Sequence, residues 1–98
     1  MKVSILDIHC LNAVCDDYEQ LQEIVADVRR SSHGNVADQE VAACLMDLAR
    51  DGLVAFFRFN ASTGTYIPQF NLPTDLSGVW ITLTEAGRRE LNANWIDD

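Results

Sequence analysis

The stretch that decides the fold covers residues 48–59 and reads LARDGLVAFFRF. Its first half has the residues of a helix end, because Gly52 can adopt the positive φ that follows a helix while Leu53 packs back on the last turn. Its second half alternates like a strand, with an apolar face (Leu53, Ala55, Phe57, Phe59) and a mixed face (Val54, Phe56, Arg58). We therefore expect a helix that ends in a Schellman motif, followed by a strand whose Phe57 and Phe59 face the core.

Three helices are predicted upstream of this stretch. The first, Val3–Cys15, is apolar on nearly every side, which is typical of a helix buried on several faces or covered by a partner protomer. The second is predicted to start at Asp16 or Asp17, because each is followed three residues later by a capping-box partner. Its apolar stripe runs out over residues 29–34, where arginine, serine and glycine are typical of a helix end.

The third helix is predicted over Val36–Asp51, with Asn35 or Asp38 as its cap. Beyond the first strand, the pattern predicts a turn, a short strand, a loop, another strand and a last helix. These segments are Asn60–Gly64, Thr65–Phe70, Asn71–Gly78, Val79–Leu83 and a helix that Thr84 caps and that runs through about Asn94. Pro68 confines the short strand to a sheet edge, because proline has no N–H to donate to a neighbouring strand.

The composition predicts one domain, residues 1–98, with a single core. Of the 98 residues 48% are hydrophobic, and the 15 acids and 7 bases leave a formal charge of −8. This charge removes the usual electrostatic reason to bind nucleic acid or an anionic membrane. No stretch approaches the roughly 20 apolar residues of a membrane span, no secretory signal is evident, and an odd number of cysteines suits reduced thiols. We therefore expect a cytoplasmic protein with no membrane partner.

Two phrases in this order of elements resemble parts of a winged-helix domain. LARDGLV at 48–54 resembles the exit from the recognition helix into the wing. ITLTEAGRREL at 81–91 resembles the return strand and following helix of bacterial PadR-like and MarR-like regulators. The resemblance covers nearly the whole chain, but the matched residues are structural, so it is informative about fold rather than function. It implies an α+β winged helix: three helices that include the helix-turn-helix, a β-hairpin wing with a long loop, and a C-terminal helix.

The resemblance also implies where a DNA-binding surface would lie. In that family the third helix enters the major groove and the wing contacts the backbone or minor groove. The outward face of the third helix would then consist of Gln39, Glu40, Ala43, Asp47 and Arg50. Between Asn35 and Gly52 there are four acids and one base, and residues 60–78 contain no lysine or arginine. Such a surface repels phosphates, which DNA-binding proteins normally contact with cations.

Two functions remain open. The preferred one is a small non-catalytic module for protein interaction or regulation, dimeric or bound to another protein, with weak or no DNA binding. The alternative is a transcription regulator of the PadR-like or MarR-like kind. In that case the candidate DNA contacts are Arg29, Arg30, Gln39, Arg50 and Arg58.

The aromatic residues exceed what one small sheet can hide, which favours an interface. The candidate interface residues are Ile5, Ile8, Leu11, Phe56, Tyr66, Trp80 and Trp95. Homodimerisation through the first and last helices is the preferred use of this apolar surplus. The alternative is that the long hairpin folds over the sheet and covers the rings.

The cysteine and histidine spacing does not indicate a metal or catalytic site. Cys10 and Cys15 lie about 140° apart around a helix, and the C-x₂-C spacing of zinc sites is missing, so we expect these two and Cys44 to pack in the core. His9 is expected to be capped or solvated, and His33 to sit at a helix end. We therefore expect no catalytic residues, no metal, no cofactor and no small-molecule ligand.

Overall fold

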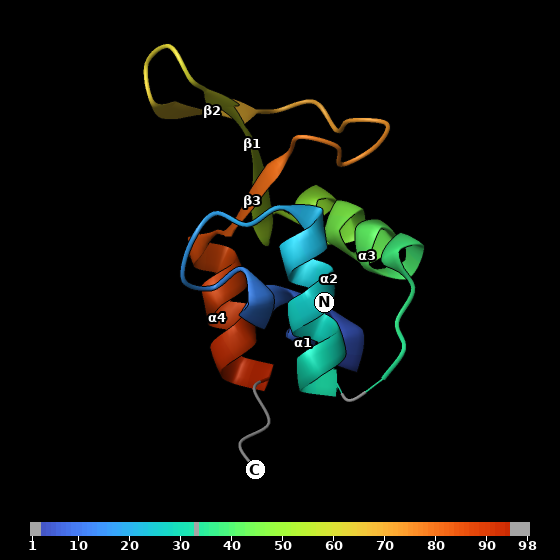
Figure 1. Ribbon diagram of the computed structural model, residues 1–98. Coiled ribbons are helices and arrows are strands. Elements are labelled where there is room, and N and C mark those ends of the chain that lie inside the picture. The colour runs from blue at the N-terminus through green and yellow to red at the C-terminus, as the bar shows by residue number, and fades with distance from the viewer. Residues whose placement is uncertain (1–2, 33, 95–98) are drawn as a thin grey trace.

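The computed structural model describes residues 3–32 and 34–94 of the chain (Figure 1). Its elements are, in order, α1 (Ile5–Ala13), α2 (Leu21–Ser32), α3 (Asp38–Arg50), β1 (Val54–Asn60), β2 (Thr65–Gln69), β3 (Trp80–Leu83) and α4 (Glu85–Asn94). The helices pack into one body, and the β1–β2 hairpin projects from it as a wing, which makes the molecule 43 Å long and 26 and 22 Å across (Figure 1). This is the predicted α+β layout of a winged helix.

The caps of α1 and α4 are formed by hydroxyl side chains. At α1 the Asp7 N–H donates to Ser4 Oγ at 3.0 Å, and the Ser4 N–H donates to the Asp7 carboxylate at 2.8 Å, which completes a capping box. At α4 the predicted cap is confirmed, because the Gly87 N–H donates to Thr84 Oγ1 at 3.0 Å. The Thr84 hydroxyl in turn donates to the Gly52 carbonyl at 2.7 Å, so the same side chain ties α4 to the end of α3.

α2 begins at Leu21, so the predicted start at Asp16 or Asp17 is wrong. The residues just before Leu21 pair with β3 instead. The Glu19 N–H donates to the Ile81 carbonyl at 2.9 Å, and the Ile81 N–H donates back to the Glu19 carbonyl at 2.8 Å. These two main-chain bonds hold a non-helical backbone where the local capping signal predicts a helix, because they satisfy backbone groups that a helix would otherwise use.

The C-terminal end of α3 is the predicted Schellman motif. Gly52 has a φ of 76°, in the left-handed region that glycine adopts without strain. The Leu53 N–H donates to the Leu48 carbonyl at 2.9 Å, and the Gly52 N–H donates to the Ala49 carbonyl at 3.1 Å. The N-terminal prediction for this helix is wrong, because the cap residue is Ala37 rather than a polar neighbour, Asn35 or Asp38.

The sheet has the strand order β2-β1-β3 and is antiparallel throughout. β2 is an edge strand, as Pro68 predicts, and Pro68 lies opposite Phe57 of β1. The hairpin turns at Gly64, whose φ is 68° and whose N–H donates to the Asn60 carbonyl at 2.8 Å. On the other side of β1, Phe56 lies opposite Ile81 of β3, where the sheet joins the helical body.

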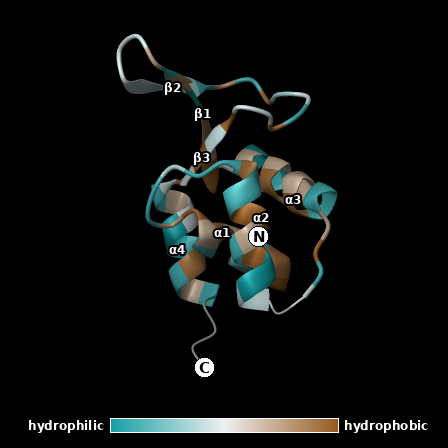
Figure 2. Cartoon of the chain, viewed as in Figure 1, coloured by the Kyte–Doolittle hydropathy of each residue, from teal (hydrophilic) through white to brown (hydrophobic). Residues whose placement is uncertain are grey.

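The core lies between the helices and the lower half of β1 and β3, where Figure 2 shows hydrophobic colour. Its buried members are Ile8, Cys10, Leu11, Val14, Ile24, Val25, Val28, Val41, Cys44, Leu45, Leu48, Leu53, Val54, Phe56, Leu76, Val79, Ile81 and Leu91. The predicted faces of β1 are therefore reversed: Phe56 is 3% exposed, whereas Phe59 is 47% exposed. The reason is that Leu53 belongs to the helix-end motif, so the alternation of the strand begins one residue later, at Val54.

Candidate functional site

α3 presents the outward face that the resemblance implies. Gln39, Glu40, Ala43, Asp47 and Arg50 are all exposed, while the opposite side of the helix is buried in the core. Asp38 and Asp51, at the two ends of the helix, are exposed as well. The exposed surface of α3 is therefore acidic, with Arg50 as the one base between residues 35 and 52.

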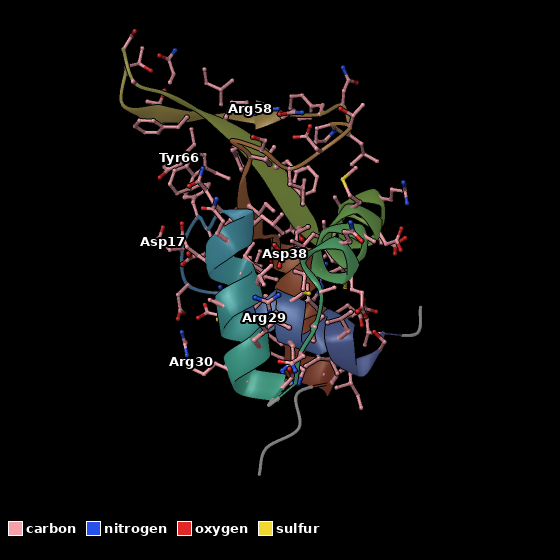
Figure 3. The ribbon with its side chains drawn as sticks, turned by 45° about the vertical axis from the view of Figure 1, so that its right-hand side comes forward. Asp17, Arg29, Arg30, Asp38, Arg58 and Tyr66 are labelled. Carbon is pink, nitrogen blue, oxygen red and sulfur yellow. The ribbon has the colours of Figure 1, made fainter. Side chains whose placement is uncertain are left out.

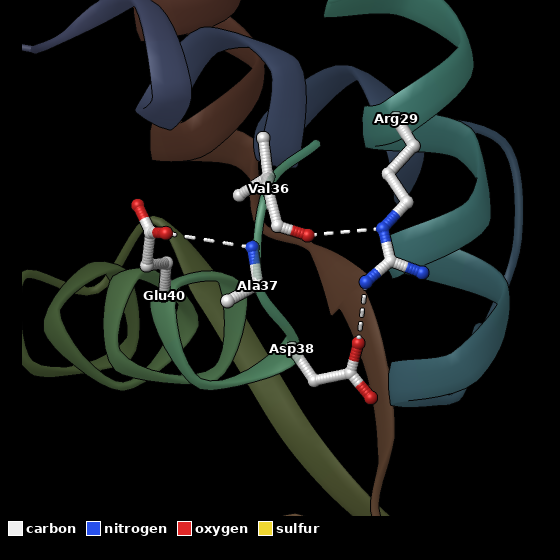
Figure 4. Close-up of polar contacts among 5 residues, drawn as sticks. All are labelled: Arg29, Val36, Ala37, Asp38 and Glu40. Atoms are coloured by element: carbon white, nitrogen blue, oxygen red, sulfur yellow. Dashed lines mark hydrogen bonds and ion pairs between the residues drawn. The ribbon is translucent and has the colours of Figure 1, made fainter. Parts of the chain in front are cut away.

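Arg29, near the end of α2, is bound by the segment that leads into α3 (Figure 4). Its Nε donates to the Val36 carbonyl at 2.9 Å, and its Nη2 donates to Asp38 Oδ1 at 2.9 Å. Asp38 is the first residue of α3, where exposed N–H groups and the helix dipole favour an anion. Glu40 contributes a second carboxylate to this helix start, since its Oε1 accepts from the Ala37 N–H at 3.4 Å. The chain's own carboxylates thus occupy the position that favours a phosphate.

Two further candidate DNA contacts are held by acids on their own helices. Arg30 forms an ion pair with Asp27 at 2.8 Å, and Arg50 forms one with Asp47. Both pairs are separated by three residues, so each guanidinium lies along its helix surface beside the carboxylate. Each arginine therefore brings an acid of the same helix to any surface that it contacts.

Arg58, the candidate contact in the wing, is held by neutral acceptors. Its Nε donates to Gln69 Oε1 at 2.6 Å, and its Nη1 donates to the Ser77 carbonyl at 2.9 Å, so it joins the hairpin to the following loop. Figure 3 shows Arg58 on the wing and Arg29 and Arg30 well below it along α2. The candidate cations are not gathered into one stripe.

The remaining arginines of the described residues are also engaged. The Arg88 Nη2 donates to the Cys15 carbonyl at 2.9 Å, and Arg89 lies 3.7 Å from the Glu85 carboxylate. Each arginine in residues 3–32 and 34–94 therefore has a hydrogen-bond acceptor or an ion-pair partner within the chain.

Five aromatic side chains form one cluster on the side of the sheet that faces away from the core; this surface is called the aromatic face below. Its members are Tyr18, Phe57, Phe59, Tyr66 and Trp80. Tyr18 stacks on Tyr66 with ring centroids 3.9 Å apart, and Tyr66 meets Trp80 edge-on at 5.5 Å. None of the five is buried, so the described part of the chain leaves this face partly open. Tyr18 falls within the helix that is predicted to start at Asp16 or Asp17, because its spacing to Leu21 is helical, but it lies in the connection before α2.

The candidate interface residues divide between core and surface. Ile8, Leu11 and Phe56 are buried in the core of a single chain, so their assignment to an interface is wrong. Ile5 is 66% exposed, and Tyr66 and Trp80 lie in the aromatic face. Trp95 lies outside the described residues. The long hairpin also does not fold over the sheet; it extends away from the body (Figure 1).

A second apolar surface lies where α3 ends and the wing begins. Phe70 and Leu72, in the loop after β2, are 92% and 41% exposed. With Ala49, Phe56 and Pro68 they line a groove of about 270 Å³. The sequence predicts a loop here but gives no signal that it would present exposed apolar side chains.

A polar cleft of about 320 Å³ lies between α1 and α2, lined among others by His9, Asp16, Glu19, Asp27 and Arg30. The pKa of Glu19 is raised to about 7, first by a hydrogen bond shared with the Glu23 carboxyl and then by burial and by the charges of nearby acids. The hydrogen bond between Glu19 and Glu23 therefore favours a protonated carboxyl at this position, and burial and the nearby acids add to the effect.

The histidine and cysteine side chains do not form a metal cluster within the described residues. His9 Nδ1 lies 2.9 Å from Ser31 Oγ, which links α1 to the end of α2. Cys10 and Cys44 are buried as predicted, whereas Cys15 is only half-buried. The Cys44 Sγ donates to Asp7 Oδ1 at 2.9 Å, and the neighbouring Cys10 and burial raise the pKa of this thiol.

The chain matches no protein-family model, no curated protein and no solved structure. In the described ranges, none of the helices combines the length and the apolar character needed to cross a bilayer.

Proposed function

We propose that the chain is a non-catalytic winged-helix module that binds another protein and has weak or no affinity for DNA. The observation that carries this proposal is the internal pairing of the arginines. Arg29, beside the start of α3, and Arg50, on its exposed face, are each bound to a carboxylate of that helix. A DNA phosphate would have to replace Asp38 and Asp47 as partners and would still lie beside them.

The energetics favour this conclusion. An exposed ion pair contributes only about 0–1 kcal/mol, so exchanging its carboxylate for a phosphate is not prevented by the pair itself. The larger effect is on the net charge, because DNA binding draws its affinity from cations that release counterions from phosphates. At α3 each such cation is accompanied by a carboxylate, and Glu40 and Asp51 add further negative charge. The surface has no net positive charge with which to displace counterions.

A partner of different sequence is favoured over a second copy docked through α1. Ile8 and Leu11 are used in the chain's own core, which leaves Ile5 as the exposed one of the three candidate residues on α1. A single side chain provides too little apolar area for a stable dimer, which needs about 800 Å² per partner. We therefore do not expect a homodimer that forms through α1.

The alternative is a PadR-like or MarR-like regulator, and the exposed Gln39 and Arg50 on α3 are the observation in its favour. The two functions are separated by retention on immobilised heparin and on a duplex DNA column at low salt. We expect the wild-type chain to pass through both columns. Retention that falls steeply with salt and is lost in Arg50→Ala, but kept in the matched control Arg89→Ala on α4, would establish the DNA-binding alternative instead.

A further inference from the structure

We propose that the aromatic face is the surface on which the protein partner docks, and that the partner contributes a segment rich in arginine and lysine. This inference rests on the proposed function and specifies the chemistry of the partner. It is carried by the open aromatic rings and by the carboxylates that border them.

The rings form a continuous platform on the outer side of the sheet. Tyr66 lies at its centre, with Tyr18 stacked on it and Phe59 and Trp80 at 5.2 and 5.5 Å between ring centroids. Phe57 closes the cluster through an edge contact with Tyr18 at 5.1 Å. Phe59 is 47% exposed and the other rings are half-buried, so ring surface is accessible along the face. A surface of this kind is typical of protein contacts, where tyrosine, tryptophan and phenylalanine are enriched.

Carboxylates border the platform where the chain leaves α1. The Asp17 carboxylate accepts from the main-chain N–H of Tyr18 at 2.7 Å, so it lies beside the backbone of the residue whose ring stacks on Tyr66. Figure 3 shows Asp17 and Tyr66 on the same side of the molecule. Asp16 and Asp17 are exposed, and Asp17 also lies close enough to Glu19 to act on it electrostatically.

The cations near this border are already engaged within the chain. Arg88 is bound to the Cys15 carbonyl, and Arg30 is paired with Asp27. Residues 60–78 contain neither lysine nor arginine, and Arg58 of β1 pairs with Ile67 and so points to the side of the hairpin opposite Phe59. The aromatic face therefore has a negative border, and the arginine of the wing lies on the other side of the hairpin.

Aromatic rings beside carboxylates match the chemistry of a guanidinium or ammonium group. A guanidinium stacks on a ring face through cation–π attraction and can form a bidentate bond to a neighbouring carboxylate. Single-stranded nucleic acid also stacks on aromatic rings, but its phosphates would be repelled by Asp16 and Asp17. A second copy docked face to face would bring the two acidic borders together, so a basic partner is the occupant that this surface fits.

The inference is tested with an arginine octapeptide as the probe, added to the isotope-labelled full chain at low salt. The variant Phe59→Ser removes an exposed ring from the aromatic face. The matched control is Ile67→Ser, because Ile67 is also 47% exposed but pairs with Arg58 and so points to the opposite side of the same hairpin. A lysine octapeptide and an oligothymidylate serve as comparison ligands.

We expect the arginine peptide to shift the Trp80 indole N–H signal and the amides of Asp17 and Tyr18. Phe59→Ser should weaken binding by about fivefold, as expected for one lost cation–π contact, while Ile67→Ser binds as the wild type does. Equal affinities of the two variants, shifts confined to the acids of α3, tighter binding of the oligothymidylate, or a wild-type dimer that Phe59→Ser dissociates would each overturn the inference. Equal affinities of the two variants, or shifts confined to α3, would leave the proposed lack of duplex DNA binding unaffected. That proposal is tested separately by the heparin and duplex columns.

Discussion

Gly87 allows the first turn of α4 to lie against the main chain at the end of α3. A Cβ at this position would lie 1.9 Å from the Leu53 carbonyl oxygen and 2.7 Å from Leu83 Cδ1. Alanine is the better helix former by about 1 kcal/mol, but the clash with backbone at Leu53 cannot be relieved by rotating a side chain. We expect Gly87→Ala to lower the free energy of unfolding by about 2–3 kcal/mol, measured by urea denaturation.

The control for this prediction is Gly34→Ala. A Cβ at Gly34 would have its nearest contact at 3.7 Å, with Ser32 Oγ, which is ordinary van der Waals distance. This variant should unfold within about 0.5 kcal/mol of the wild type. A Gly87→Ala variant as stable as Gly34→Ala would show that α4 does not pack against the end of α3 as described.

Glu19 makes stability depend on pH. Its pKa is raised from 4.5 to about 7 in the folded chain, because the Glu23 carboxyl shares a hydrogen bond with it and burial and nearby acids disfavour its charge. A raised folded-state pKa stabilises the fold below the unfolded value, and this stabilisation is lost as the pH rises through the folded value. We therefore expect the titration of Glu19 to lower the urea midpoint of unfolding as the pH rises from 4.5 to about 7.

Glu19→Gln provides the measurement, because glutamine resembles the protonated carboxyl and does not titrate. The variant should have a higher urea midpoint than the wild type at pH 8 and a flatter dependence on pH. A carboxyl titration of Glu19 by NMR with a midpoint below pH 5 would contradict the account of the acidic cluster.

At the scale of elements, Arg29 sets the connection between α2 and α3. Its two hydrogen bonds, to the Val36 carbonyl and to Asp38, bridge the segment that joins the helices. Because the Arg29 and Asp38 side chains are both exposed, we expect Arg29→Ala to lower the free energy of unfolding by only about 0.5–1 kcal/mol, with faster amide hydrogen exchange at the start of α3.

Arg30→Ala is the matched control at the neighbouring position. Its ion pair with Asp27 lies within α2, so the variant should leave exchange at the start of α3 unchanged. Equal effects of the two substitutions would show that the contact between α2 and α3 does not depend on Arg29.

The sequence predicts the ends of an element correctly where a local motif determines them. The Schellman end at Gly52 and the Thr84 cap are confirmed, because their hydrogen bonds join residues only a few positions apart. The start of α2 and the buried face of β1 were not predictable in this way. They depend on the pairing of Glu19 with Ile81 and on Leu53 closing the preceding helix, and these long-range and overlapping effects outweigh the local pattern.

At the scale of the whole molecule, the sequence predicts the acidic surface of α3 because helical spacing determines which residues point outward. It does not predict that the arginines are bound within the chain, since Arg58 and Arg88 reach acceptors on other elements. The sequence also does not predict the aromatic face, because this surface combines Tyr18 from the connection before α2 with rings from all three strands. A surface that is assembled from several elements can be identified only once the fold is known.

The measurement that tests the central claim most directly is fluorescence anisotropy of a labelled random duplex, titrated with the wild-type chain at about 50 and 150 mM salt. The charge distribution at α3 predicts no binding at micromolar protein at either salt concentration. A second titration uses the chain with Asp38→Asn, Glu40→Gln and Asp47→Asn, which should gain salt-dependent binding because Arg29 and Arg50 lose their carboxylate partners. Micromolar binding by the wild type that weakens steeply with salt would contradict the account.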